Sequence, residues 1–339
     1  MSERLSFPPL RIGPFELAAP AVLAPLAGYT DLSYRRVCRK LGAKFCYTEV
    51  TLDTSINQSP KLRLKLIQPA EDDHPLAGQI MGCKPETMAV AARHLVALGC
   101  DVVDLNFACP VRKVLRRKRG GHLMRDPDTA VATIGAVAAA LDGQVPFTVK
   151  VRKSFAEADE DLSAFWQIAE AAFDAGAAAL TVHGRSVEAR YTGPADWEFL
   201  ARVKQHFRDK TIIGSGDALS PQHAVQMLQQ TGVNGVAFAR AALGNPWIFR
   251  QFEALLAGQE PAAPTLAEQR EVIACHHALC VEQYGRERGR RMMHRFGIKY
   301  ARCHPNPKLV RHAFFDAPAG PEVEAILDQY YGPGQVTPA

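Results

Sequence analysis

The segment from Asp101 to Val114, DVVDLNFACPVRKV, combines residue types that could transfer a proton. It begins as a β-strand of valine and leucine and stops at Cys109-Pro110, because proline has no N–H to donate to a sheet ladder. A cysteine is most often a small buried apolar residue, but a thiol with a pKa of about 8.5 can also act as an acid near neutral pH. On spacing alone, both interpretations of Cys109 remain open.

The composition is that of an ordinary globular protein. The chain has 339 residues, 47% of them hydrophobic, which is enough for one large domain and a smaller one. No apolar run reaches the roughly 20 residues of a membrane span, and the N-terminal segment lacks the charged-then-apolar order of a signal peptide. We therefore expect a cytoplasmic protein with no membrane segment.

Cysteine spacing and charge narrow the class further. The eight cysteines form no C-x-x-C pair and no disulfide-like pattern, so we expect neither disulfides nor a bound metal. The formal net charge of +5 permits a nucleic-acid partner without requiring one. We expect a monomer.

Eight short apolar runs alternate with segments of helical period along most of the chain. The runs are AVLAPLAG from Ala21, KFCYTEV from Lys44, PLAGQIMG from Pro75, DVVDLN from Asp101, FTVKVR from Phe147, ALTVHGR from Ala179, TIIGSGD from Thr211 and GVAFARA from Gly235. Eight alternations predict a (β/α)8 TIM barrel. The connection from Thr51 to His74 is the least regular piece, and we expect a loop over the barrel mouth there.

A doubly wound sheet is the competing architecture. It would normally carry an early G-x-G-x-x-G fingerprint, whereas the first strand here leads into APLAGYTD. The barrel is therefore favoured.

The pattern changes after the barrel. AGQEPAAPT, residues 257–265, reads as a linker, and the following segment has helical character throughout. We predict a barrel domain over residues 1–256, a smaller all-helical domain over residues 266–332, and a flexible tail over residues 333–339.

Polar residues stand at the predicted C-terminal ends of the strands, where barrels build their active sites. They are Gln79, Asn106, Cys109, Lys150, Arg152, His183, Arg185, the GSGD segment from Gly214 to Asp217, and Arg240. Each alone could be structural, but so many polar groups at one barrel mouth would be costly to bury without a ligand.

The last two strands suggest a phosphate site. Glycines at the seventh strand and an arginine at the eighth match the phosphate-binding position that barrels often have. Backbone N–H groups near Gly214 and Gly216, with the guanidinium of Arg240, could hold a phosphate monoester. This arrangement points to a phosphorylated cofactor such as FMN.

Seven motifs together resemble the tRNA-dihydrouridine synthases: APLAGYTD, GQIMG, LNFACPVRKV, TVKVR, HGR, GSGDA and GNPWIF. The resemblance covers all eight strands and the helical tail. It implies an FMN-dependent oxidoreductase of the bacterial type that reduces a uracil base in tRNA to dihydrouracil. It also implies NADPH as the reductant and a helical RNA-binding domain after the barrel.

The resemblance also assigns individual residues. It implies flavin contacts by Pro25, Leu26, Ala27, Gln79, Lys150, His183, Ser215, Gly216, Asp217, Ala239 and Arg240, and it places Asn106 between flavin and substrate. Three positions depart from the family, which usually has methionine at Leu26, asparagine at Ser215 and glycine at Ala239. Ala239 is the least comfortable departure, because its methyl group stands where backbone approaches phosphate.

The chemistry of uracil explains why this family needs a cysteine. The C5=C6 bond is conjugated to the C4 carbonyl, so a hydride from the flavin adds at C6 and leaves an enolate that must take up a proton at C5. An acid is needed on the face opposite the flavin, and Cys109 fits that role. Lys150 would place a cation near the pyrimidine end of the flavin, and Arg152 would contact flavin or RNA.

Two basic clusters fit a polyanion. One follows Cys109, from Arg112 to Arg119, and the other runs from Arg286 to Arg311 with nine Lys/Arg and one acid. Arg291, Arg295 and Lys299 recur at helical spacing and predict a basic stripe that contacts RNA. A reacting base must be extruded from folded RNA or lie in a loop.

Two other functions remain open on the sequence. The first is a flavin-dependent barrel that reduces a small molecule, which would leave the helical domain and basic clusters unused. The second is a noncatalytic RNA-binding barrel, and a ribosomal target is an alternative to tRNA.

Overall fold

A computed structural model describes residues 4–159, 162–316 and 322–332 of the chain. The predicted tail, residues 333–339, lies outside the described residues. The chain forms two compact units: a barrel unit, residues 6–31 and 44–238, and a helical unit, which takes residues 4–5, residues 32–43 and the described residues from 239 onwards.

Eight parallel strands close the barrel in the order β4-β3-β11-β10-β9-β8-β7-β6, and β6 pairs back with β4. The strands are β3 (Ala21–Leu23), β4 (Cys46–Tyr47), β6 (Leu76–Met81), β7 (Val102–Asn106), β8 (Phe147–Arg152), β9 (Ala179–His183), β10 (Ile212–Ser215) and β11 (Gly235–Phe238). Because the sheet closes on itself, the predicted TIM barrel is confirmed and the doubly wound sheet is excluded.

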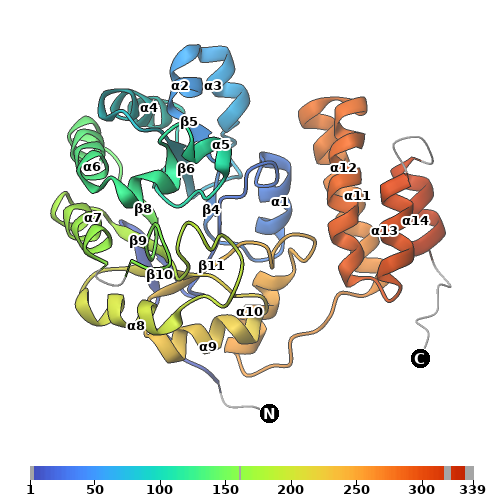
Figure 1. The fold of residues 1–339 in the computed structure, drawn as a ribbon. Helices are drawn as coiled ribbons and strands as arrows, with labels where there is room; N and C mark the ends of the chain where they lie inside the picture. The colour runs from blue at the N-terminus through green and yellow to red at the C-terminus, as the bar shows by residue number, and fades with distance from the viewer. Residues whose placement is uncertain (1–3, 160–161, 317–321, 333–339) are drawn as a thin grey trace. The chain divides into compact units, whose positions relative to one another are not determined.

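Helices of the barrel unit lie around these strands in Figure 1. They are α4 (Pro85–Ala97), α6 (Pro127–Leu141), α7 (Ser163–Asp174), α8 (Trp197–His206) and α9 (Pro221–Thr231), and a short α5 (Arg112–Leu115) and the 3-10 helix η1 (Gly120–Arg125) follow β7. Covered strands are buried on both faces, so β7 is buried along its whole length. Polar side chains within such a strand therefore need partners from the fold or a ligand.

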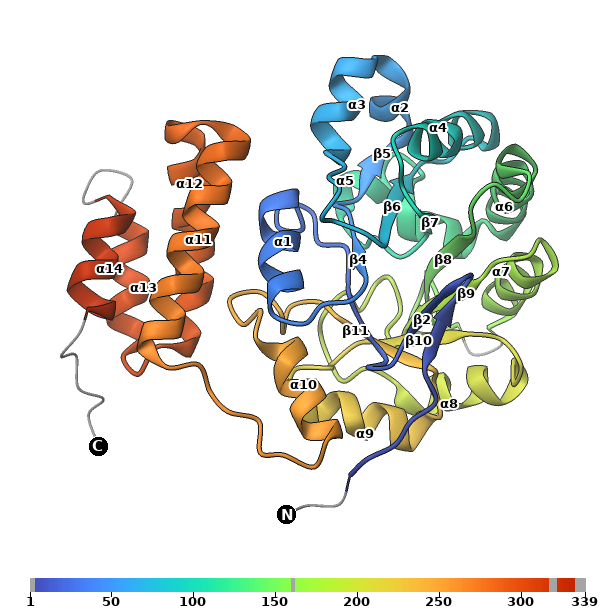
Figure 2. The same cartoon turned by 180° about the vertical axis from the view of Figure 1, so that it is seen from behind.

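A β-hairpin of β1 (Leu10–Ile12) and β2 (Phe15–Leu17), dark blue in Figure 2, lies at the opposite end of the barrel from the predicted site. A Cβ on Gly235, the first residue of β11, would lie 2.6 Å from Leu10. A Cβ on Gly13 would lie 2.8 Å from Pro146, which directly precedes β8. The hairpin thus packs against the N-terminal ends of the strands and leaves the C-terminal ends for function.

The segment from Thr51 to His74 was expected to be an irregular loop, and this expectation was wrong. It contains β5 (Thr51–Leu52), α2 (Asp53–Gln58) and α3 (Pro60–Ile67). The Ser59 hydroxyl accepts the N–H of Leu62 at 3.3 Å, and Pro60 occupies the first turn, where its missing N–H costs nothing. The helix was not predicted because its apolar pattern is weak and the start signals at Ser59 and Pro60 are short and local.

The helical unit contains seven helical elements within its described residues. They are α1 (Leu32–Lys40), α10 (Ile248–Leu256), α11 (Leu266–Tyr284), α12 (Arg286–Tyr300), the 3-10 helix η2 (Ala301–Cys303), α13 (Pro307–Asp316) and α14 (Val323–Tyr331). Its core includes Tyr34 of α1, whose ring stacks on Phe296 of α12 at 4.8 Å. His276 of α11 is buried beside both rings.

The C-terminal helices follow the predicted linker. Residues 257–265 form no helix or strand, and Thr265 then caps α11 in a reciprocal capping box with Glu268. The compact helical unit also includes α1 and α10, so it is larger than the predicted helical domain, residues 266–332. The predicted domain bounds stay a prediction. None of the described helices is long and apolar enough to cross a membrane.

Candidate active site

The peptide that carries Cys109 is held from two sides. The Asn106 Oδ1 atom accepts the N–H groups of Ala108 and Cys109, both at 3.0 Å. The Arg152 Nε atom donates to the carbonyl of Ala108 at 2.9 Å. β7 ends at Asn106, so this turn presents Cys109 directly beyond the strand. The predicted placement of Cys109 beside Asn106 at a strand end is therefore seen in the structure.

The Cys109 thiol is only partly accessible. Burial raises its pKa above the ordinary value, while a hydrogen bond from the Val111 backbone and the charge of Arg152 act in the opposite direction. The thiol is therefore protonated at neutral pH and can supply a proton. The nearby Arg152 charge would stabilise the thiolate that remains.

Four polar side chains meet in the buried interior beside this turn. The Asp104 Oδ2 atom accepts from Gln79 Nε2 at 2.6 Å, and its Oδ1 atom accepts from the Thr148 hydroxyl at 2.5 Å. Gln79 Oε1 in turn accepts from Asn106 Nδ2 at 2.8 Å. Gln79 and Asn106, both predicted site residues, are thus joined directly.

Asp104 is a residue that the sequence reasoning missed. It lies two positions before Asn106 on β7 and is completely buried. Alternation along a strand puts residues i and i+2 on one face, so the period of two could have placed Asp104 with Asn106. Burial raises the pKa of Asp104 to about 6, against the opposing effects of its hydrogen bonds and of Lys150.

Lys150 lies on β8 opposite Asn106 in the strand register. Its Nζ atom is enclosed and has no hydrogen-bond partner among the described residues. Burial lowers the pKa of Lys150 to about 8, and the Asp104 carboxylate partly offsets this effect. A buried ammonium with unused donors is the kind of group that an electron-rich ligand would satisfy.

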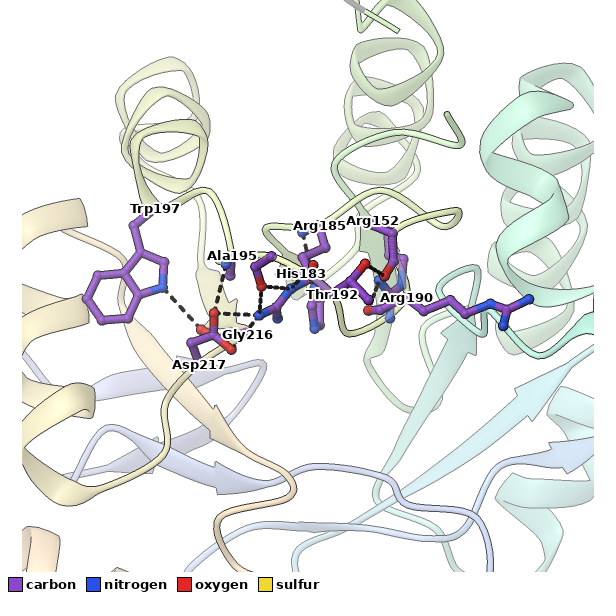
Figure 3. A network of polar contacts seen from close by, with 11 residues as sticks. Arg152, His183, Arg185, Arg190, Thr192, Ala195, Trp197, Gly216 and Asp217 are labelled. Carbon is purple, nitrogen blue, oxygen red and sulfur yellow. Dashed lines mark hydrogen bonds and ion pairs between the residues drawn. The ribbon is translucent and has the colours of Figure 1, made fainter. Parts of the chain in front are cut away.

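The ends of β9 and β10 form a second network, shown in Figure 3. The Arg185 Nη2 atom donates to both carboxylate oxygens of Asp217, at 2.7 and 2.6 Å. Asp217 also accepts the N–H of Ala195 at 2.7 Å, and Trp197 Nε1 donates to the Gly216 carbonyl at 3.1 Å. These bonds hold the turn after Ser215.

The turn requires glycine. Gly216 has a φ of +110°, and a Cβ there would lie 2.7 Å from the Ala195 side chain. His183 lies against the same turn, and its Nδ1 atom accepts the N–H of Arg185 at 3.2 Å, so the neutral ring carries its proton on Nε2. His183, Ser215, Gly216 and Asp217 are therefore brought together as predicted, although the Asp217 carboxylate itself bonds to Arg185 and Ala195.

The remaining predicted residues are less closely tied to this site. Pro25, Leu26 and Ala27 follow β3 in a turn that the Thr30 hydroxyl closes on Leu26. Ala239 and Arg240 follow β11 directly in the chain but belong to the helical unit, so their roles stay predictions.

Arg152 is buried and is not displayed toward solvent. Besides Ala108, it donates to the carbonyls of Ser186 and Arg190 at 2.8 and 2.9 Å. These contacts make Arg152 a support for the Cys109 turn, and its predicted contact with flavin or RNA stays a prediction.

The predicted basic stripe lies on α12. Arg291 and Arg295 are exposed, whereas Lys299 is half-buried near the end of the helix. A Cβ on Gly244 would clash with the Lys299 carbonyl, so the backbone packs closely there. Met293, Phe296 and Tyr300 face the core of the helical unit, as the helical period predicts.

The residues present fit FMN. The enclosed Lys150 Nζ atom offers unused donors to an electron-rich ring, and the glycine turn after β10 allows close backbone approach to a phosphate. Both lie at the C-terminal ends of the barrel strands.

A closed parallel barrel with these polar groups at its C-terminal end defines a TIM-barrel enzyme. A profile of the dihydrouridine synthase family matches residues 22–330. The chain belongs to the dihydrouridine synthase family, and membership implies an oxidoreductase that uses a flavin.

Individual relatives support the assignment. The chain is 38% identical over 308 residues to tRNA-dihydrouridine synthase B of Pseudomonas aeruginosa, which covers 90% of each protein. It is 34% identical over 337 residues to a probable tRNA-dihydrouridine synthase of Mycobacterium tuberculosis, covering 96% of this chain and 85% of that protein.

Solved structures share the fold at low identity. Histamine dehydrogenase from Rhizobium sp. 4-9 matches with a TM-score of 0.58 and 14% identity over 81% of this chain and 51% of that protein. 6-Hydroxypseudooxynicotine amine oxidase from Pseudomonas geniculata N1 matches with the same TM-score and identity, over 81% of this chain and 53% of that protein. This chain spans about half the length of these structures, which support the barrel and nothing beyond it.

Proposed function

We propose that the protein is a tRNA-dihydrouridine synthase that reduces the C5=C6 bond of a uridine in tRNA, with FMN as cofactor and NADPH as reductant. The observation that carries the proposal is the thiol of Cys109, held beside Asn106 at the barrel end. There the Lys150 ammonium has no hydrogen-bond partner in the part of the chain that the structure describes. The family and the relatives named above support the same activity.

When bound, FMN supplies the hydride that adds to C6 of the uracil ring. Cys109 supplies the proton: its S–H bond breaks as the C5–H bond forms, and a thiolate remains. The charge of Arg152 favours that thiolate, since it acts to lower the pKa of Cys109. Burial keeps the thiol protonated until the enolate has formed and its C5 atom takes up the proton.

The remaining residues hold the reactants. Lys150 would donate from Nζ to the electron-rich pyrimidine end of a bound flavin, and Gln79 and Asn106 would orient flavin and base. Backbone N–H groups after β10 would bind the phosphate. Arg240, in the helical unit, stays a predicted phosphate contact. Exposed basic residues of the Cys109 loop, among them Arg112, Lys113, Arg116 and Arg117, contact the RNA backbone around the extruded uridine.

The helical unit supplies a second RNA contact through Arg291, Arg295 and Lys299. Its residues 266–332 serve as the RNA-binding domain, and residues 1–256 as the FMN-binding catalytic domain.

The test is to purify the protein, record its flavin spectrum, and incubate it with NADPH and unmodified tRNA. The expected results are a yellow protein and dihydrouridine at a defined tRNA position, with the same position unmodified in cells that lack the gene. Rapid reduction of free uridine without RNA would instead indicate a small-molecule reductase. A colourless protein that cannot be reconstituted with FMN would refute the proposal.

A further inference from the structure

Asp104 is a buried carboxylate to which the proposed mechanism gives no role. It lies in the middle of β7, two residues before Asn106, and it is fully shielded from solvent. It accepts hydrogen bonds from Gln79 at 2.6 Å and from the Thr148 hydroxyl at 2.5 Å. A buried carboxylate is costly, so its contacts call for an explanation beyond packing.

The contacts of Asp104 continue as a chain to the cysteine peptide. Gln79 donates to Asp104 and accepts from Asn106 at 2.8 Å, and Asn106 accepts the N–H groups of Ala108 and Cys109 at 3.0 Å. Each side-chain amide in this chain donates at its NH2 end and accepts at its oxygen end. All bonds of the chain therefore point the same way, from the Cys109 turn toward Asp104.

The two ends of the chain fix this direction. Backbone N–H groups can only donate, and an ionised carboxylate can only accept. If Asp104 were neutral, its O–H could donate to Gln79 and allow that amide to turn round. Asn106 would then have to turn as well, and its NH2 would face the N–H groups of Ala108 and Cys109, donor against donor.

We propose that Asp104 is a positioning residue for the reduction: its carboxylate fixes the direction of this chain and so holds the peptide, and with it the thiol, of Cys109. The proposal rests on the role of Cys109 in the proposed function. It adds a residue that touches neither the uracil base nor the reacting sulfur.

The charges around Asp104 set the pH range of the effect. Tyr47 from β4 and Lys150 from β8 are the titratable groups that interact with it. Burial raises the pKa of Asp104 to about 6, while the hydrogen bonds of Gln79 and Thr148 and the charge of Lys150 act against this rise. The carboxylate is therefore present at neutral pH and is lost as pH falls through about 6, which would release the chain.

The experiment is residue-resolved hydrogen exchange of the full-length, flavin-loaded protein at the amides of Ala108 and Cys109. Exchange rates are compared at pH 7.5 and pH 5 after correction for the intrinsic rate. Wild type should lose protection at these amides by about tenfold at the lower pH, the effect of one weakened hydrogen bond. The Asp104→Asn variant should show the lower protection at both pH values.

Two variants sharpen the result. Gln79→Met interrupts the hydrogen-bonded chain and should lower the protection of the Cys109 amide as Asp104→Asn does. Asp128→Asn makes the same Asp-to-Asn change at the exposed start of α6 and should leave the protection of the Cys109 amide at the wild-type level. Asp104→Asn should also lower kcat for tRNA while KM stays near wild type. Amides of β9 serve as the folding control.

Wild-type protection that does not change with pH would overturn the proposal, even if neither variant folds. Equal protection of Cys109 in wild type and in a folded Asp104→Asn variant would overturn it as well. These outcomes are separate from the proposed function, because exchange is measured without RNA or turnover. A wild-type protein that forms no dihydrouridine would remove the assigned reaction while leaving the exchange result unaffected.

Discussion

The Arg185 guanidinium and the Asp217 carboxylate form a pair in which one nitrogen, Nη2, donates to both carboxylate oxygens, at 2.7 and 2.6 Å. Arg185 is almost fully buried, and Asp217 has a φ of +61°, an uncommon conformation for a residue with a side chain. The pair joins the loop after β9 to the turn after β10. It therefore secures the glycine turn that we assign to the FMN phosphate.

Arg185→Met should destabilise the protein by about 3 kcal/mol, because Asp217 loses its charged partner and the carbonyls of Thr192 and Gly193 lose a donor. Urea unfolding of the flavin-free protein measures this loss. Arg117→Met, at an exposed position, is the matched control and should change stability by less than about 0.5 kcal/mol. A stable Arg185→Met variant with normal FMN affinity would show that the turn holds itself.

Cys109→Ala should leave NADPH oxidation by the bound flavin nearly intact and should lower uridine reduction by about 10²–10⁴-fold, because the proton donor is lost. Stopped-flow flavin spectra and dihydrouridine assays separate the two half-reactions. Cys83→Ala, at another partly exposed cysteine, is the control. If Cys109→Ala reduced tRNA at the normal rate, the proton would have to come from another group.

Lys150 should make stability depend on pH in the alkaline range. Burial lowers its folded-state pKa to about 8, from an ordinary value of about 10.4. Between these values the unfolded chain binds more protons, so this residue makes the free energy of unfolding rise with pH. The cost of burying the ammonium is thus fully present below about pH 8 and disappears as the pH rises.

Lys150→Met should remove this rise, so the stability difference between the variant and wild type should shift in favour of wild type from pH 8 to pH 10.5. Urea unfolding of the flavin-free proteins over that range measures it, with the exposed Lys113→Met as control. A constant difference would mean that Lys150 titrates normally in the folded protein.

The stripe on α12 should contribute to RNA affinity. Arg291→Glu with Arg295→Glu reverses the two exposed charges of the stripe. Lys299 is left unchanged because it is half-buried. The double variant should bind tRNA more weakly. The slope of log affinity against log salt concentration should flatten by somewhat less than one unit per lost phosphate contact.

Flavin content and NADPH oxidation should be unchanged in the double variant. Arg208→Glu with Lys210→Glu, which reverses two exposed charges just before β10 in the barrel unit, lowers the net charge equally and tests whether net charge alone explains the effect. Wild-type affinity and salt slope in the folded Arg291→Glu, Arg295→Glu protein would assign RNA binding to other surfaces, with the loop from Arg112 to Arg119 as the next candidate.

Much of the barrel was predictable from local pattern. Strands buried on both faces need continuous apolar runs, and each of the eight predicted runs contains one barrel strand of the structure. The segment from Thr51 to His74 was not predictable in this way, because α3 depends on the local cap of Ser59 and Pro60 and carries a weak apolar pattern. The site residues at the strand ends followed from the same reasoning, since parallel strands place their C-terminal ends together.

Local pattern could not show which partner each polar side chain takes. Arg152 was expected to reach flavin or RNA, yet in the folded chain it bonds to the carbonyls of Ala108, Ser186 and Arg190. Asp104 looked like one more residue of an apolar strand, but strand pairing puts it between Gln79 and Thr148. Sequence spacing determines which residues reach the barrel mouth. Only tertiary packing determines which donors meet which acceptors there, because those partners come from different strands.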